Sequence, residues 1–169
     1  MTAPFRVEAL LDHDRTRFSC RNRALDRYFK TLVTQDIRRH VANCFVAVEA
    51  ATGALAGFYT IAAAGIPTPD LPPDITKRLP RYPTLPAVRI GRLAIDHRFQ
   101  GRGLGGALLA DAAAKALHEP AAAFALLVDA KDDGAVAFYE HHGFQRFASQ
   151  PRVLFLPLAT AAKALRTVR

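Results

Sequence analysis

The sequence predicts an α/β fold in one domain spanning residues 1–169, with a mixed central sheet. Its 169 residues and 50% hydrophobic content suffice for one core and are short for two. Periodic apolar segments follow in the order β-α-β-β-β-α-β-α-β-β, which is typical of a mixed α/β domain. A loop with glycines at alternate positions, Gly101, Gly103 and Gly105, joins an apolar strand to a helix.

The first part of the chain predicts a strand, a helix and a hairpin. Apolar and charged residues alternate over residues 6–11, and Asn22 is a suitable cap for a helix over residues 23–39. Residues 43–50 and 54–63 predict a hairpin, in which Gly57 marks a bulge or a close approach of the backbone. The apolar face of the helix recurs at helical spacing and comprises Leu25, Tyr28, Phe29, Leu32 and Val33.

The second part begins with a proline-rich stretch, residues 67–86, which we expect to be an ordered loop with a short helix at 74–78. A central strand at 87–96 leads into the glycine loop. A helix at 104–117 follows, with one apolar face made of Leu104, Leu108, Ala112 and Ala116. A buried strand at 122–129 and a helix at 132–142, which stops at Gly143, come next. Two strands at 144–147 and 152–155 and a helical or frayed tail at 159–169 complete the chain.

The chain is basic, with a net charge of +8 and a pI of about 10.1. This balance favours a polyanionic partner such as a nucleotide cofactor, a nucleic acid or an acidic protein tail, although genome composition is a second explanation for an arginine excess. The helix at 23–39 poses the same choice, because its basic stripe is either a solvated face or a surface that follows phosphates. That stripe comprises Arg27, Lys30, Thr34 and Arg38, with Arg39 beside them.

Several function classes are not expected. The two cysteines, Cys20 and Cys44, lack CxxC spacing, and the six histidines lack metal-ligand spacing, so we expect no metal. No apolar run is typical of a secretory signal or long enough to span a bilayer. We therefore expect a cytoplasmic protein with reduced thiols and no membrane contact, while the sequence leaves a disulfide between the two cysteines open.

The glycine loop predicts a phosphate site. Glycine lets the backbone approach a ligand, and the helix after the loop directs unpaired N–H groups and its positive dipole end toward it. A dinucleotide-binding loop would need an acidic residue that ends a second strand about 20 residues further on, and a Walker loop would need Gly-Lys-Ser/Thr. Neither is present. An ordinary β-α turn is the remaining alternative.

The pattern Gln100-x-x-Gly103-x-Gly105 before a helix resembles the pyrophosphate loop of the GNAT N-acetyltransferases, which bind acetyl-coenzyme A. The resemblance implies the GNAT fold, with a splayed strand pair and an acetyl-CoA loop at a helix N-terminus. It also implies that the strand before the loop offers backbone groups to the cofactor and a donor to an oxyanion. The acetyl-CoA residues implied are Leu93, Ala94, Ile95, Gln100, Gly101, Arg102, Gly103, Leu104, Gly105, Asp129 and Phe138.

A second stretch, Phe138-Tyr139-x-x-x-Gly143-Phe144, resembles the Phe-Tyr-x-x-x-Gly-Phe signature of the same family. The resemblance implies that Tyr139 is catalytic and protonates the departing thiolate. The chemistry is reasonable, because amine attack on a thioester expels a thiolate of pKa about 8.5, and a positioned O–H is a general acid for it. The alternative is that Tyr139 is an aromatic residue that packs on the core.

Motifs across most of the chain resemble the TacT/AtaT-like GNAT toxins, among them Leu79-Pro80-Arg81-Tyr82-Pro83 and Gly91-Arg92-Leu93-Ala94-Ile95-Asp96. This resemblance implies acetylation of the α-amino group of charged tRNA, which blocks translation. It implies a homodimer, and a ribbon-helix-helix antitoxin through which alone the toxin reaches operator DNA. The residues implied to face tRNA are Lys30, Arg38, Arg39, Arg81 and Arg89.

The acceptor implied by the resemblance agrees with the residues present. An α-amino group has a pKa of about 8, and an ester lowers it, whereas a lysine of pKa about 10.4 needs a strong base. The sequence offers no carboxylate dyad or His–Asp pair as such a base. One alternative is an acetyltransferase for a small amine or a protein N-terminus. The other is an idle acetyl-CoA-binding module, against which the presence of both Tyr139 and the glycine loop argues.

Overall fold

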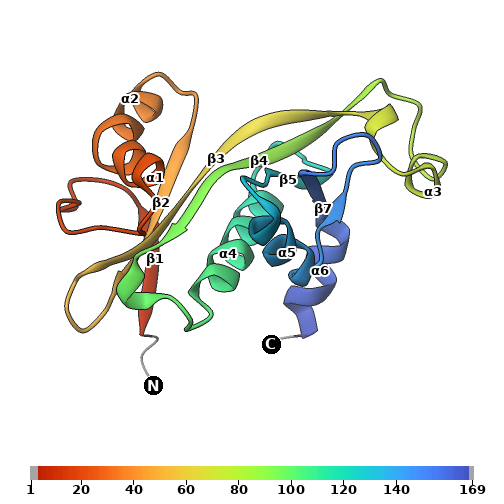
Figure 1. Ribbon diagram of the computed structural model, residues 1–169. Helices are drawn as coiled ribbons and strands as arrows, with labels where there is room; N and C mark the ends of the chain where they lie inside the picture. The colour runs from red at the N-terminus through yellow and green to blue at the C-terminus, as the bar shows by residue number, and fades with distance from the viewer. Residues whose placement is uncertain (1–3, 168–169) are drawn as a thin grey trace. The chain divides into compact units, whose positions relative to one another are not determined.

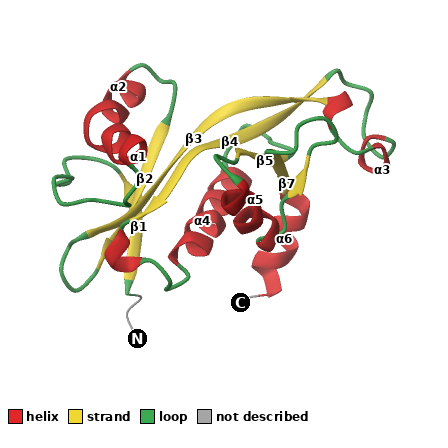
Figure 2. Cartoon of the chain, in the orientation of Figure 1, coloured by secondary structure: helices red, strands yellow, loops and turns green. Residues whose placement is uncertain are grey.

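The computed structural model describes residues 4–167 (Figures 1 and 2). Hydrogen bonds join its seven strands in the order β1-β2-β3-β4-β5-β7-β6. β4 and β5 are parallel, whereas the β1–β2, β2–β3, β5–β7 and β6–β7 pairs are antiparallel. The predicted mixed α/β class is therefore confirmed. The strands are β1 (Phe5–Ala9), β2 (Asn43–Glu49), β3 (Leu55–Pro67), β4 (Thr84–Ile95), β5 (Ala125–Asp129), β6 (Gln145–Arg146) and β7 (Val153–Pro157).

The helices follow the predicted order and are α1 (Arg23–Arg27), α2 (Val33–Arg38), α3 (Pro73–Thr76), α4 (Leu104–His118), α5 (Asp133–His141) and α6 (Leu158–Thr167). A π-helical turn, Tyr28–Leu32, joins α1 to α2, and 3-10 turns lie at Thr68–Asp70 and His97–Phe99. Of the two states expected for the tail, helical or frayed, the described part is helical, while residues 168–169 lie outside the described residues.

The chain forms two compact units. The described part of the first unit comprises residues 4–62 and 91–111, and that of the second comprises residues 63–90 and 112–167. Strands β3 and β4 and helix α4 each contribute residues to both units, so the chain crosses from one unit to the other within regular elements.

Aromatic rings form the core of the first unit. Phe29, in the π-helical turn, stacks on Phe58 of β3 with ring centroids 4.2 Å apart, and Phe18 packs edge-on against both. All three side chains are buried, as are Val33 of α2 and Val46 of β2. The predicted apolar face of the helical segment is therefore the face that covers the sheet (Figure 1).

The π-helical turn corrects one part of the helix prediction. Val33 N–H donates to the Tyr28 carbonyl, an i→i+5 bond that places one extra residue in the turn. Consequently Leu32, predicted to lie on the buried face, is 37% exposed, while Val33 is fully buried. The regular spacing that predicted one continuous basic stripe is interrupted at the same place, and Thr34 is half-buried.

The β2–β3 hairpin confirms both expectations for Gly57. The register slips opposite it, with Ala47 facing Gly57 and Val48 facing Leu55, so the hairpin has a bulge there. A Cβ at Gly57 would lie 3.0 Å from the Ala94 carbonyl oxygen. Only glycine permits this contact between β3 and the strand that leads into the glycine loop.

The second unit has its own apolar core, in which Ile66 of β3 and Leu127 of β5 pack with Phe155 of β7. The proline-rich loop is shorter than predicted, because β3 continues to Pro67 and β4 already begins at Thr84. A hydrogen bond of 3.0 Å from the Thr68 N–H to the Pro83 carbonyl closes the loop at these strand ends. The β6 strand is also shorter than predicted, since Phe144 and Phe147 turn into the core on either side of Gln145–Arg146.

Candidate active site

The glycine loop in the first unit has the conformation of an anion cradle. Gly101 and Gly103 have φ angles of +78° and +77°, a left-handed conformation that side chains other than glycine rarely adopt. A Cβ at either position would meet nothing within 4 Å, so the space beside the backbone is open. Gly105 is the second residue of α4 rather than a loop residue. Its N–H is one of the helix-terminal donors that an incoming anion binds.

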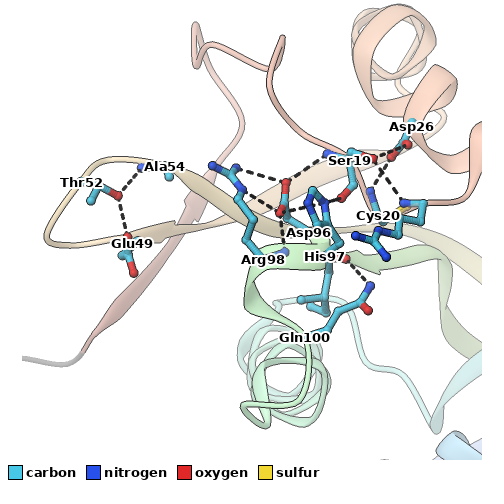
Figure 3. Close-up of polar contacts among 12 residues, drawn as sticks. Ser19, Cys20, Asp26, Glu49, Thr52, Ala54, Asp96, His97, Arg98 and Gln100 are labelled. Carbon is cyan, nitrogen blue, oxygen red and sulfur yellow. Dashed lines mark hydrogen bonds and ion pairs between the residues drawn. The ribbon is translucent and has the colours of Figure 1, made fainter.

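The two predicted acetyl-CoA segments of the first unit contact each other. The Gln100 side-chain amide donates a 3.1 Å hydrogen bond to the Ile95 carbonyl (Figure 3). The parallel ladder of β4 with β5 covers only residues 87–90 of β4, which leaves residues 93–95 outside it. This is the splayed strand expected from the sequence. Of these residues Ala94 is buried, whereas Leu93 and Ile95 are half-buried.

A buried carboxylate holds the base of the loop. Asp96 is fully buried and accepts hydrogen bonds from the Ser19 N–H at 3.0 Å, the Arg98 N–H at 2.9 Å and the Arg98 guanidinium at 2.9 and 3.2 Å (Figure 3). The His97 N–H in turn donates to the Ser19 carbonyl at 2.8 Å. Asp96 thus ties the segment before α1 to the turn that starts the glycine loop. Sequence reasoning gave Asp96 no role, because its partner Ser19 lies 77 residues away.

The same contacts determine the charge of Asp96. Burial by itself would raise the pKa of its carboxyl, but the hydrogen bonds from Arg98 and Ser19, with the Arg98 charge, hold that pKa below its usual value. The ion pair raises the pKa of Arg98 in return. The carboxylate is therefore ionised at neutral pH and keeps its four accepted hydrogen bonds.

Three arginines border an open hollow of about 650 Å³ beside the loop. Arg102 lies over the Phe99 ring, with its guanidinium carbon 5.3 Å from the ring centroid, and Arg98 lies 5.4 Å from the same centroid. Arg17 completes the set, and the acidic Asp14 and Glu49 also line the hollow. The predicted residue Arg102 is exposed, so its charge faces solvent next to the cradle.

In the second unit, α5 holds Tyr139 in a fixed position. Asp132 caps the helix by accepting a 2.8 Å hydrogen bond from the Ala135 N–H, and Gly143 ends it with a φ of +91°. The Tyr139 side chain is only 8% exposed and packs edge-on against Phe138 and Phe144, at centroid distances of 5.2 and 5.3 Å.

The Tyr139 hydroxyl is protonated and accessible. Burial raises the pKa of Tyr139 to about 12, so the group carries its proton at neutral pH. Among residues 4–167 no buried side-chain oxygen lacks a partner, and no described residue hydrogen-bonds this hydroxyl. Its oxygen therefore reaches solvent at the tip of an otherwise buried ring. A protonated, unpartnered O–H is what a general acid requires.

The histidines after Tyr139 do not form a strong base. Burial, together with the neighbouring His141, lowers the pKa of His142, whose ring packs on Phe138 at 4.8 Å. Over residues 4–167 there is no group of three or more His, Cys, Asp or Glu side chains that could hold a metal ion. Both cysteines are free thiols, as expected. In the first unit, His97 lies 3.6 Å from the Asp96 carboxylate, which corrects the expectation that the chain has no His–Asp pair.

Two predicted site residues in the second unit pair with each other. Asp129, at the end of β5, forms an ion pair with Arg89 on β4, and both side chains are partly exposed. The sequence had assigned them different ligands, acetyl-CoA for Asp129 and tRNA for Arg89. Because the two charges compensate each other, acetyl-CoA would meet a paired Asp129 carboxylate and tRNA a paired Arg89 guanidinium.

The other predicted tRNA residues are exposed cations. Lys30 lies in the π-helical turn, with Arg38 and Arg39 at the end of α2, all in the first unit, while Arg81 belongs to the second. Sequence reasoning missed Arg92, whose guanidinium lies 3.6 Å from the Tyr28 ring centroid. Nothing in the sequence pattern signals this contact, since it joins two segments 64 positions apart.

Residues 79–154 match the family model described as an acetyltransferase (GNAT) domain. A Mycobacterium tuberculosis protein named tRNA-acetylating toxin is 33% identical over 90% of this chain and 90% of its own length. A Sinorhizobium fredii protein named "Probable toxin TacT" is 30% identical over 88% of this chain and 87% of its own length.

Solved structures of toxins are similar over nearly the whole chain. A mutant of KacT with a tyrosine replaced by phenylalanine is 26% identical, with a TM-score of 0.88 over 96% of this chain and 99% of that one. AtaT complexed with acetyl-methionyl-tRNAfMet is 26% identical, with a TM-score of 0.83 over 97% and 98%. AtaTR bound with acetyl-CoA is 26% identical, with a TM-score of 0.79 over 96% and 98%.

No helix within the described residues is long and apolar enough to cross a membrane. The identity to curated toxins over nine-tenths of the chain agrees with the splayed strand, the glycine cradle and the buried tyrosine described above. The chain belongs to the GNAT acetyltransferases, acetyl-CoA-dependent enzymes, and within them to the TacT/AtaT-like toxins.

Proposed function

We propose that this protein transfers the acetyl group of acetyl-CoA to the α-amino group of an aminoacyl-tRNA and thereby blocks translation. The observation that carries the proposal is Tyr139, whose ring is buried while its protonated hydroxyl has no partner among the described residues. The names of the two curated relatives, and the acetylated tRNA bound to AtaT, support tRNA as the acceptor.

We assign the acetyl-CoA site to the glycine cradle and the splayed strand. The residues fit the cofactor, because the open, left-handed Gly101 and Gly103 and the start of α4 offer N–H groups to a pyrophosphate. Residues 93–95 lie outside the β4–β5 ladder, which leaves backbone groups for the amides of the pantetheine arm. Acetyl-CoA supplies an activated thioester, and we infer that the described chain holds it without a metal.

In the reaction that we infer, the amine nitrogen forms a bond to the thioester carbonyl carbon, and the carbon–sulfur bond then breaks. Tyr139 donates its O–H proton to the departing sulfur and regains a proton from solvent. A backbone N–H in residues 93–95 stabilises the oxyanion. The amine attacks in its neutral form, which dominates for an esterified α-amine at cellular pH, and the positively charged nitrogen formed by the attack releases one proton to water to give the amide.

We further infer that both compact units serve one acetyltransferase domain over residues 1–169, acting in the cytoplasm, where charged tRNA is found. The similarity to toxins supports a cognate antitoxin. We propose that this antitoxin is a ribbon-helix-helix protein, that operator DNA is reached only through it, and that the toxin is a homodimer.

The test is transfer of radiolabelled acetyl from acetyl-CoA to charged tRNA, compared with deacylated tRNA and with a panel of free amines and peptides. Label on charged tRNA alone is the expected result. Label on free amines or peptides instead would contradict tRNA as the acceptor and favour an acetyltransferase for small amines or protein N-termini. Absence of label from every acceptor, in protein that binds acetyl-CoA, would favour an idle binding module.

A further inference from the structure

The proline-rich segment between β3 and β4 presents one aromatic ring to solvent. Tyr82 is 61% exposed, whereas every other Phe and Tyr side chain among residues 4–167 is buried or half-buried. Single exposed apolar residues are common on proteins. The surroundings of Tyr82 therefore decide whether its exposure has a function.

The backbone that carries Tyr82 is fixed on both sides. The Tyr82 N–H donates a 2.9 Å hydrogen bond to the Pro80 carbonyl, and the Tyr82 carbonyl accepts a 2.5 Å hydrogen bond from the Thr68 hydroxyl. The Thr68 N–H also donates to the Pro83 carbonyl. Pro80 and Pro83, on either side of Tyr82, each have a φ fixed by the proline ring. The segment is therefore already ordered, and it loses little conformational entropy when a ligand binds to the tyrosine ring.

The hollow beside this ring is positively charged. Tyr82 lines an open groove of about 590 Å³ together with Lys77 and Arg81, and the rest of the lining is proline, threonine and leucine. No acidic side chain lines it, and neither Lys77 nor Arg81 has an ion pair among the described residues. A flat ring beside two free cations complements a ligand that joins a planar base to a phosphate.

We propose that Tyr82 is a stacking platform for an unpaired nucleotide of the tRNA substrate. Its ring takes one base face-on, and Lys77 and Arg81 contact the flanking phosphates. A tyrosine can stack on any of the four bases, so the platform strengthens binding without selecting sequence. The inference rests on the proposed function, because it takes tRNA as the acceptor.

The test compares Tyr82→Ala and Tyr82→Phe with the unmodified protein in equilibrium binding of labelled deacylated tRNA and of a blunt-ended RNA duplex. Tyr82→Ala should weaken tRNA binding about 10-fold, within the range found for loss of one base–aromatic stack. Tyr82→Phe should bind normally, since stacking needs the ring and not the hydroxyl. The blunt duplex, which has no unpaired nucleotide, should bind all three proteins equally.

Salt dependence separates stacking from charge. Tyr82→Ala should leave the slope of log affinity against log salt unchanged, while Arg81→Gln should reduce it by about one phosphate contact. Equal tRNA affinity of Tyr82→Ala and the unmodified protein would overturn the platform. A change of oligomeric state in Tyr82→Ala with unchanged RNA binding would identify the ring as a contact between copies and overturn it too. The acetyl-transfer assay tests the proposed function separately, because failure of the platform leaves transfer to charged tRNA intact.

Discussion

The Tyr139 hydroxyl is the group through which the structure makes its most direct chemical prediction. Tyr139→Phe removes one oxygen and keeps the ring between Phe138 and Phe144. We expect turnover to fall at least 100-fold, the lower range for loss of a general acid, with acetyl-CoA affinity changed less than about two-fold. Single-turnover kinetics and calorimetry measure the two quantities. Full activity would contradict the assignment.

The raised pKa of Tyr139 also predicts the pH profile. The proton donor is lost only as pH rises through about 12, whereas the acceptor amine becomes reactive as it deprotonates below pH 8, because the ester lowers the α-amine pKa from about 8. The rate should therefore rise with pH and reach a plateau near neutral pH, with no fall below about pH 10. A descending limb near pH 9 would assign the acid to a different group.

Asp96 predicts an effect on stability. Asp96→Asn places a buried NH2 group against N–H donors of Ser19 or Arg98 and leaves those donors unpaired, so we expect about 2 kcal/mol lower free energy of unfolding. Because the folded-state pKa of Asp96 is lowered, its contribution is present above the unfolded pKa of about 3.9 and is lost as pH falls through the folded value. Urea unfolding between pH 2 and 7 measures both effects. The exposed Asp12→Asn is the matched control and should change stability by less than about 0.5 kcal/mol.

At the scale of elements, substitutions in the glycine loop can distinguish the cost of a left-handed φ from an effect on acetyl-CoA binding. Gly103→Ala introduces no clash, so its cost is the left-handed φ alone, about 1 kcal/mol. Gly53→Ala, in the β2–β3 turn, has a similar φ of +74° and equally open space. Both variants should lose similar stability by thermal unfolding, but only Gly103→Ala should raise the KM for acetyl-CoA. An equal KM in both variants would exclude the loop from cofactor binding.

The helical segment of the first unit tests the basic face. Reversing charge at Lys30 and Arg38 should weaken tRNA binding and lower its salt slope by up to about two. Lys163→Glu with Arg166→Glu on α6 makes the same change of net charge at exposed positions and should leave the slope nearly unchanged. Identical slopes for the two double variants would mean that the face is merely solvated.

At the scale of the whole molecule, the two units predict one unfolding transition. Each has its own apolar core, yet β3 and β4 pass through both, so unfolding either unit disrupts strands of the other. Phe58→Ala and Phe155→Ala each remove a fully buried ring from one core. Each variant should lower the free energy of unfolding by about 3–5 kcal/mol and should shift the midpoint of the same single urea transition to a lower concentration. Two separate transitions by circular dichroism and tyrosine fluorescence would contradict a single cooperative domain.

Much of the fold was predictable because its signals are local. The Asn22 cap, the Gly143 stop and the apolar face of α4 each depend on residues within a turn of one another. The missed features arise from contacts distant in sequence. Leu32 is exposed because of a π-helical turn that no residue spacing announces, and the role of Asp96 depends on Ser19. The motif residues of the site were likewise predictable, but not the pairing of Arg89 with Asp129.

The hydrogen bond from Gln100 to the Ile95 carbonyl has a consequence for ligand exchange. A ligand whose amide N–H donates to the Ile95 carbonyl displaces the Gln100 side chain, so the number of hydrogen bonds that this carbonyl accepts stays constant. Binding then exchanges one hydrogen-bond donor for another, and the Ile95 carbonyl is paired both before and after the ligand binds. A ligand without an amide at this position leaves the Gln100 hydrogen bond in place, so the Ile95 carbonyl stays paired in either case.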